Sequence, residues 1–180
     1  IKAGDYVLLL GTGGVSIFGL QIAKALGANV IITSSSDDKL ARAAGLGADT
    51  TINYKDNPDW GKQAFEATGR GVNLVIEIGG GGTFNQSMEA LTIGGHISII
   101  GALSGVSTEL NLLNMVFKNV HTHGITVGTR EDHEAMNHFL AEHKIHPVID
   151  KEVSFDQGAE AIIGIASGNH FGKIVVNIHN

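Results

Sequence analysis

Short apolar runs alternate with segments of helical periodicity along the first hundred residues. Residues 6–10 form a continuous apolar run that ends at a glycine, which is typical of a strand buried on both faces. Residues 15–26 then repeat apolar side chains at helical spacing, and Gly27 follows as a helix-ending residue. The same pattern predicts further strands at residues 29–33, 50–53, 72–77 and 96–100, separated by helices at residues 37–44, 58–68 and 84–91.

This alternation of strands and helices with short connections predicts parallel strands joined by right-handed crossovers. Because both faces of such a sheet must be covered, we expect a three-layer, doubly wound α/β domain. That is a Rossmann fold with a mostly parallel six-stranded sheet, and residues 121–127 are predicted as its exposed edge strand. The rest of the chain predicts helices near residues 112–116, 130–143 and 157–165, and a last strand at residues 173–178.

Composition narrows the class of protein. The 180 residues suffice for one domain, and 43% apolar against 17% charged residues favours a folded chain. A net charge of −6 without a basic run argues against nucleic-acid binding, and the lack of cysteine excludes disulfides and cysteine-ligated zinc. Neither a membrane-spanning apolar run nor a leader pattern occurs, so we expect no membrane partner and a cytoplasmic location. The strand pattern begins almost at Ile1, which indicates a domain cut from a longer protein.

The most informative motif is the glycine-rich turn at residues 11–16, GTGGVS, between the first strand and the first helix. Gly11 permits a tight turn, Gly13 lets a pyrophosphate approach the backbone, and the helix N-terminus offers free N–H groups. Ser16, which is small, stands where such patterns have their third glycine. Because the turn lies in the first strand–helix unit, we interpret it as dinucleotide-binding rather than purely structural.

A second cofactor contact is expected about 20 residues further on, at the end of the second strand. An acidic residue there would bind a ribose 2′-hydroxyl, but Ser34 occupies the position, with Ser35 after it. Residues 37–38 are aspartates that come later and are interpreted as helix caps. Lys39 and Arg42 lie three residues apart on the following helix. Hydroxyl groups beside two cations suit a phosphate monoester, so we predict a preference for NADP(H) over NAD(H).

Residues 11–24 (GTGGVSIFGLQIAK), with Leu26-Gly27-Ala28 after them, strongly resemble the cofactor domain of medium-chain dehydrogenases/reductases. This superfamily contains the zinc-type alcohol dehydrogenases and the quinone and enoyl reductases. The resemblance covers nearly the whole chain, continuing through residues 45–49, 52–54, 94–95 and 128–130 to the final motif at 171–175, FGKIV. Several motifs in the same order make it far more specific than the glycine turn alone.

The resemblance implies cofactor contacts at the carboxyl ends of the strands. At the pyrophosphate it implies Gly11, Thr12, Gly13, Gly14 and Val15, and on the adenosine side Ser34, Ser35, Lys39 and Tyr54. At the nicotinamide ribose and ring it implies Ile78, Gly79, Gly101, Ala102 and Leu103. Phe171 and Lys173 are expected to close over the nicotinamide half and its phosphates. Tyr54 and Lys173 also have a simpler interpretation, as surface residues at strand ends.

The same resemblance implies what the chain lacks. The family's catalytic zinc ligands and substrate pocket belong mostly to a GroES-like domain, which nothing in residues 1–180 resembles. We therefore assign no catalytic or metal-binding residue, expect zinc only through that domain, and expect the chain alone to be inactive. The implied reaction is hydride transfer between the nicotinamide and an alcohol/carbonyl pair or the activated C=C bond of a quinone or enoyl substrate. The alternative is a non-catalytic nucleotide-binding or structural module of the same fold; Ser34 argues against a methyltransferase.

Nine histidines raise the question of a metal site. His121 and His123 lie two apart on a predicted strand and so share a face, but neither an H-E-x-x-H motif nor a cysteine accompanies them. We interpret the histidines as surface or partly buried residues. In the resembled family the corresponding edge strand pairs across a two-fold axis, so we expect a homodimer formed through residues 121–127.

Overall fold

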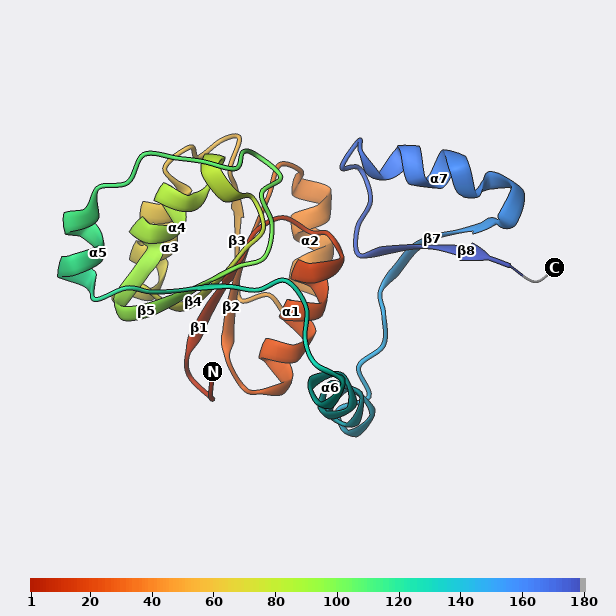
Figure 1. Cartoon of the computed structure of the whole chain (residues 1–180), viewed down its shortest axis with the longest axis horizontal. Helices are drawn as coiled ribbons and strands as arrows, with labels where there is room; N and C mark the ends of the chain where they lie inside the picture. Colours follow the sequence, from red (N-terminus) through yellow and green to blue (C-terminus); the bar gives the residue numbers. More distant parts are fainter. Residues whose placement is uncertain (179–180) are drawn as a thin grey trace.

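The computed structural model of the chain describes residues 1–178 and is built around a six-stranded parallel sheet (Figure 1). The spatial order of its strands is β3-β2-β1-β4-β5-β6. The strands are β1 (Tyr6–Leu9), β2 (Asn29–Ser34), β3 (Thr50–Asn53), β4 (Val72–Glu77), β5 (Leu91–Ile99) and β6 (His121–Gly124). This is the predicted doubly wound Rossmann fold, whose order reverses between β1 and β4, where ligands of such sheets bind.

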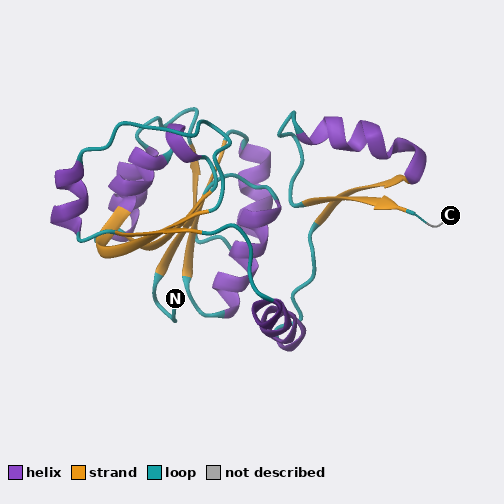
Figure 2. Cartoon of the chain, viewed as in Figure 1, coloured by secondary structure: helices purple, strands orange, loops and turns teal. Residues whose placement is uncertain are grey.

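Helices cover both faces of the sheet, because the central strands are apolar on both sides (Figure 2). On one face, Val7 and Leu9 of β1 pack with Ile17 and Leu20 of α1 and with Leu40 of α2. The helices on this face are α1 (Gly14–Ala25) and α2 (Asp37–Gly45), and on the other face α3 (Trp60–Thr68), α4 (Phe84–Ala90) and α5 (Leu112–Lys118).

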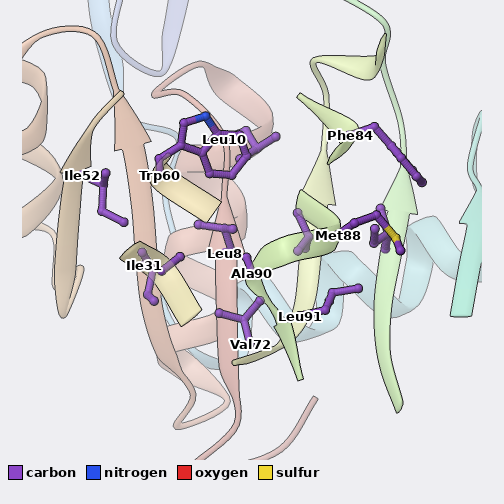
Figure 3. Packing of buried hydrophobic residues seen from close by; sticks show 13 residues of the cluster. Leu8, Leu10, Ile31, Ile52, Trp60, Val72, Phe84, Met88, Ala90 and Leu91 are labelled. Carbon is purple, nitrogen blue, oxygen red and sulfur yellow. The ribbon is translucent and has the colours of Figure 1, made fainter. Parts of the chain in front are cut away.

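Side chains along β1 point alternately to the two faces of the sheet, so the strand contributes to a core cluster on each face. Leu8 and Leu10 point to the side opposite Val7 and Leu9, as the two-residue period of a strand requires. They pack with Trp60 of α3 and Met88 of α4 in the cluster shown in Figure 3. The two clusters lock the strand register, since a slip by one residue would exchange the faces.

The C-terminal part forms a second, smaller unit beside the sheet, at the right of Figure 1. After α6 (Arg130–Glu142), the strands β7 (Ile149–Ser154) and β8 (Lys173–Asn177) form a two-stranded parallel sheet, connected through α7 (Gly158–Ile165). The sequence pattern did not predict β7, because its IDKEVS sequence carries polar residues at four of six positions and buries only Val153. Short 3₁₀ turns occur at Gly80–Gly82 and Phe155–Gln157.

Several predicted boundaries need correction. The edge strand predicted over residues 121–127 ends at Gly124 as β6, and α3 begins at Trp60 rather than near Pro58. The strand predicted at 96–100 is β5, which begins earlier, at Leu91. Glycines at 94–95 conceal this extension in the sequence, because glycine normally weakens a strand pattern. Within residues 1–178 the structure contains no helix with the length and hydropathy of a membrane span.

Candidate functional site

The glycine-rich turn connects β1 to α1 at the reversal of strand order. Gly11 has φ of +69°, a left-handed conformation that glycine adopts without steric cost, and its N–H points to the Thr33 hydroxyl (3.3 Å). Ser16, at the place of the third glycine, is fully buried and donates a hydrogen bond to the Leu10 carbonyl (2.6 Å). The serine therefore satisfies its hydroxyl inside the close helix–strand contact that a glycine usually permits.

The N-terminus of α1 is open to an anion. Its N-cap, Gly13, has no side chain to accept from the first-turn N–H groups, and the first turn holds no acidic residue. A Cβ built on Gly13 would meet only His170 Nε2, at 3.8 Å, and φ at Gly13 is −78°. Uncapped N–H groups and the positive end of the helix dipole attract phosphates, so this backbone fits a pyrophosphate.

The C-terminal segment crosses this turn and brings a cation to it. Gly172 N–H donates to the Thr12 carbonyl (2.9 Å), which fixes the segment beside the turn. Lys173 lies over the start of α1, since a Cβ on Gly14 would be 2.6 Å from its Nζ. His170 Nδ1 is buried without a hydrogen-bond partner in the protein. His170 was not among the predicted site residues, although its place two residues before the glycine of the FGKIV motif was a usable signal.

At the carboxyl end of β2 lies a polar cavity of about 580 Å³. It contains three of the predicted adenosine-side residues, Ser35, Lys39 and Tyr54, together with Arg42. Ser34 is not among the lining residues: its side chain is buried and accepts from Ser36 N–H (3.3 Å). The remaining lining residues are Ser36, Asp38, Lys55, Ser167, Gly168 and Asn169.

Both cations predicted to bind a phosphate already contact the C-terminal segment. Lys39 Nζ donates to the Gly168 carbonyl (2.5 Å), and Arg42 forms an ion pair with Asp150 (2.8 Å). Partial burial lowers the pKa of Lys39; the negative charge of Asp150 opposes this effect and the positive charge of Arg42 adds to it. The α2 helix itself begins at its Ser36 cap, whose hydroxyl accepts from Lys39 N–H (3.4 Å), with the two predicted aspartates in its first turn.

The structure places Phe171 away from the cleft surface implied by the resemblance. Its ring is 1% exposed and packs in the core cluster of α1 and α2. The Arg42 guanidinium lies 4.1 Å from the ring centroid, and Phe171 N–H donates to Asp150 (3.2 Å). A ring buried in this way has no surface to offer a ligand, so Phe171 acts by anchoring the C-terminal segment to α2.

At the carboxyl ends of β4 and β5, a fully buried carboxylate organises two loops. Glu77 Oε1 accepts from the N–H groups of Gly79 (2.8 Å) and Gly80 (3.0 Å) and from the Thr83 hydroxyl (2.5 Å). Its second oxygen accepts from the Ser87 hydroxyl at the start of α4. Glu77 was predicted only as the end of a strand, although an acidic residue that closes an apolar strand shortly before four glycines was a usable signal.

The two loops are also joined backbone to backbone. The carbonyls of Ile78 and Gly79 accept from Leu103 N–H (3.2 Å) and Ser104 N–H (2.7 Å). Gly101 allows this approach, because a Cβ there would lie 2.6 Å from the Ile78 carbonyl oxygen. The residues predicted to line the nicotinamide therefore form one surface, with Leu103 83% exposed on it.

Most of the predicted contact residues thus follow the carboxyl ends of β1 to β5, at one end of the sheet, with Tyr54 directly after β3. Lys173, the first residue of β8, comes from the C-terminal segment. Val15, the last of the pyrophosphate set, is 44% exposed in the first turn of α1, and Thr12 is buried beneath the crossing segment. In the observed conformations of residues 1–178, no three His, Cys, Asp or Glu side chains gather around one point that a metal ion would occupy.

The chain is similar in sequence to a known family of dehydrogenases. Residues 14–142 match the sequence profile of a family described as zinc-binding dehydrogenase. A zinc-type alcohol dehydrogenase-like protein of Schizosaccharomyces pombe is 45% identical over 183 residues, covering 99% of this chain and 53% of that protein. The chain spans about half the length of the curated relatives it matches.

Solved structures agree over nearly the whole chain. That of an NAD-dependent alcohol dehydrogenase is similar with a TM-score of 0.91 at 34% identity, covering 99% of this chain and 52% of the other. That of a 2-octenoyl-CoA carboxylase reductase in complex with NADP and 2-octenoyl-CoA gives a TM-score of 0.90 at 25% identity, covering 98% and 44%.

Proposed function

Because the chain belongs to the zinc-binding dehydrogenase family, within the medium-chain dehydrogenases/reductases, we propose that it binds a nicotinamide dinucleotide, with NADP(H) preferred over NAD(H). In this proposal it is the cofactor-binding part of a hydride-transferring oxidoreductase. The observation that carries the proposal is the uncapped N-terminus of α1, open at Gly13 and backed by Lys173.

The residues of the chain bind and orient; the redox chemistry is supplied by the nicotinamide when it is bound. First-turn N–H groups and Lys173 would hold the pyrophosphate of the bound cofactor. The joined loops after β4 and β5 would present Gly79, Gly101 and Leu103 to its nicotinamide half. Because Glu77 fixes these loops by buried hydrogen bonds, they would offer the nicotinamide one fixed surface.

The preference for NADP(H) rests on the cavity after β2. Ser35, Lys39 and Tyr54 line it beside Arg42, so hydroxyl groups and cations face the position of an adenosine 2′-phosphate. Asp38 also lines the cavity, and its negative charge opposes a phosphate there. The sign of the preference therefore depends on the three positive charges that line the same cavity, those of Lys39, Arg42 and Lys55.

The substrate in this proposal is an alcohol/carbonyl pair or an activated C=C bond of a quinone or enoyl compound. Relatives of both kinds are found: the similar structures include an alcohol dehydrogenase and a 2-octenoyl-CoA carboxylase reductase. Catalytic residues, and zinc where it is used, would come from the part of the relatives that this chain does not match.

We further propose a homodimer through β6. This strand has a single neighbour, β5, and all four of its residues are exposed. Ile125 N–H donates to the Ile99 carbonyl (2.9 Å), so strand alternation turns the N–H groups of Thr122 and Gly124 toward the free edge. Thr122→Pro should lower the dimer fraction in sedimentation velocity; unchanged association would exclude this edge.

Titrations of NADPH and NADH, followed by cofactor fluorescence, test the proposed specificity. NADPH should bind more tightly, and Lys39→Glu should weaken NADPH binding about tenfold or more, since hydrogen bonds to charged groups are worth about 1.5–3 kcal/mol. NADH binding should change little. Lys62→Glu, on the exposed surface of α3, is the matched control. Tighter NADH binding, or equal losses of both cofactors, would contradict the assignment.

A further inference from the structure

Three histidines from two neighbouring strands lie together on one face of the sheet. The parallel register of β5 and β6 places His96 opposite His121 and Ser98 opposite His123. Paired residues share a face, and so do residues two apart on a strand, so the three imidazoles project to the same side. The ring centroid of His96 lies 4.7 Å from that of His121 and 5.7 Å from that of His123.

These imidazoles are accessible and available as ligands. All three residues are exposed, and among residues 1–178 no strand pairs with β6 on the side away from β5. The imidazole of histidine is the commonest metal ligand among side chains.

The ring of His96 is stacked on those of His121 and His123, with interplanar angles of 15° and 10°. Their nitrogen atoms therefore do not converge, in agreement with the lack of an assembled metal cluster among residues 1–178. What the fold fixes is the arrangement of the three backbone positions. Exposed side chains change rotamer within picoseconds to nanoseconds, so convergence requires side-chain rotation and no movement of the strands.

We propose that His96, His121 and His123 bind one divalent transition-metal ion of the zinc class, with water in the fourth position. Three histidine ligands with one open position form a known type of tetrahedral zinc site, and imidazole suits zinc, copper and nickel. Two histidines two residues apart on β6 and a third on β5 bring three ligands to one side of the sheet. This site lies within the β5–β6 pair and does not depend on the proposed cofactor role.

A metal ion bound by all three histidines should hold the edge strand β6 against β5. The β6 strand pairs with β5 over four residues and is exposed throughout, so it has little other packing to hold it. An ion bound by both strands stabilises the folded chain by mass action, in proportion to the logarithm of metal concentration over its dissociation constant.

Calorimetric titration of zinc chloride into the tag-free, chelator-treated chain tests the proposal. We expect one site per chain, with affinity lowered at least tenfold by each of His96→Gln, His121→Gln and His123→Gln. Even indirect partners of metal ligands are worth about 10–100-fold in affinity, so loss of a ligand should cost at least as much. His133→Gln, on the exposed surface of α6, is the matched control and should leave the affinity unchanged.

The midpoint temperature of thermal unfolding, Tm, tests zinc binding without a measurement of how many ions bind each chain. Zinc should raise the Tm of the chain and of His133→Gln, but not that of the variant with all three ligands replaced. Because these side chains are exposed, the variants are expected to fold, and their Tm without zinc checks that they do. The proposal is wrong if zinc does not bind, if His96→Gln binds it as tightly as the unaltered chain, or if His133→Gln weakens it equally.

Discussion

The two ends of the proposed cofactor cleft are stabilised by different interactions. At the nicotinamide end, the loops after β4 and β5 are joined by backbone hydrogen bonds and by the fully buried carboxylate of Glu77. At the adenosine end, the cavity after β2 is lined by partly exposed side chains, and Lys39 and Arg42 are held by a carbonyl and a carboxylate from the C-terminal segment.

This difference suits the nicotinamide end to positioning the cofactor and the adenosine end to selecting between NADP(H) and NAD(H). A buried network with every donor paired is rigid, because any displacement leaves polar groups unsatisfied in a low dielectric. Exposed ion pairs contribute little to stability and exchange partners easily, so they can be changed without loss of the fold. We therefore expect substitutions at the nicotinamide end to act on stability and those at the adenosine end to act on ligand choice.

The largest effect should come from Glu77→Ala. It leaves the N–H groups of Gly79 and Gly80 and the Ser87 hydroxyl without their acceptor, while the Thr83 hydroxyl keeps the Gly80 carbonyl (3.2 Å). Since buried unpaired donors cost about 1–3 kcal/mol each, we expect a loss of about 3–5 kcal/mol in the free energy of unfolding, measured by denaturant titration.

Two further variants sharpen this result. Glu77→Gln keeps one acceptor oxygen and should lose less than Glu77→Ala. Glu89→Ala, on the exposed surface of α4, is the control and should change stability by less than about 0.5 kcal/mol. A loss below about 1 kcal/mol for Glu77→Ala would show that the loops do not depend on this carboxylate.

At the adenosine end, Arg42→Ala should cost only about 1 kcal/mol. The guanidinium loses a partly exposed ion pair with Asp150 and its position over the Phe171 ring, each worth less than about 1 kcal/mol. Arg130→Ala, which breaks a more exposed pair with Glu134, should have no measurable effect in the same denaturant titration. Equal losses for the two arginines would remove the anchoring role given to Arg42.

The Arg42 contribution should also depend on pH. Partial burial favours a higher pKa for Asp150, but the hydrogen bonds from Arg42 and from Phe171 N–H outweigh it and lower the pKa. A lowered folded-state pKa gives stability that is present above the unfolded value of about 3.9 and lost as the pH falls through the folded value. The difference between the unaltered chain and Arg42→Ala should therefore shrink below about pH 4, in unfolding measured at a series of pH values. A constant difference would contradict this linkage.

Much of the fold was predictable because the apolar pattern of the sheet is strong. The continuous runs of β1, β2 and β4 and the helical spacing of α1 leave few alternatives. The pattern failed where packing is weak, since β7 buries one residue of six. Residues 125–127 leave the edge strand because their partner strand β5 ends at Ile99, which is paired with Gly124.

The candidate site was predictable where the backbone dictates the residue type. The left-handed φ of Gly11 and the open N-terminus of α1 follow from the glycine pattern alone. Contacts between segments that are distant in the sequence could not be predicted in this way. Arg42, which lies over the Phe171 ring, is 129 residues away from it along the chain. The N–H groups that Glu77 accepts from belong to the glycine loop after β4. Sequence patterns do not reveal such pairings, so both contacts appear only in the folded chain.

The most direct measurement concerns Gly13. A Cβ at this position meets no atom nearer than 3.8 Å, and φ is −78°, so Gly13→Ala creates no steric clash. Because alanine is a poorer N-cap residue than glycine, the free energy of unfolding should fall by no more than about 1 kcal/mol. If a pyrophosphate lies against this backbone, the added methyl group occupies its place. We predict a stably folded variant with at least a tenfold loss of affinity for NADPH and NADH alike in calorimetric titration. Undiminished binding of both cofactors by a stably folded Gly13→Ala chain would contradict this prediction.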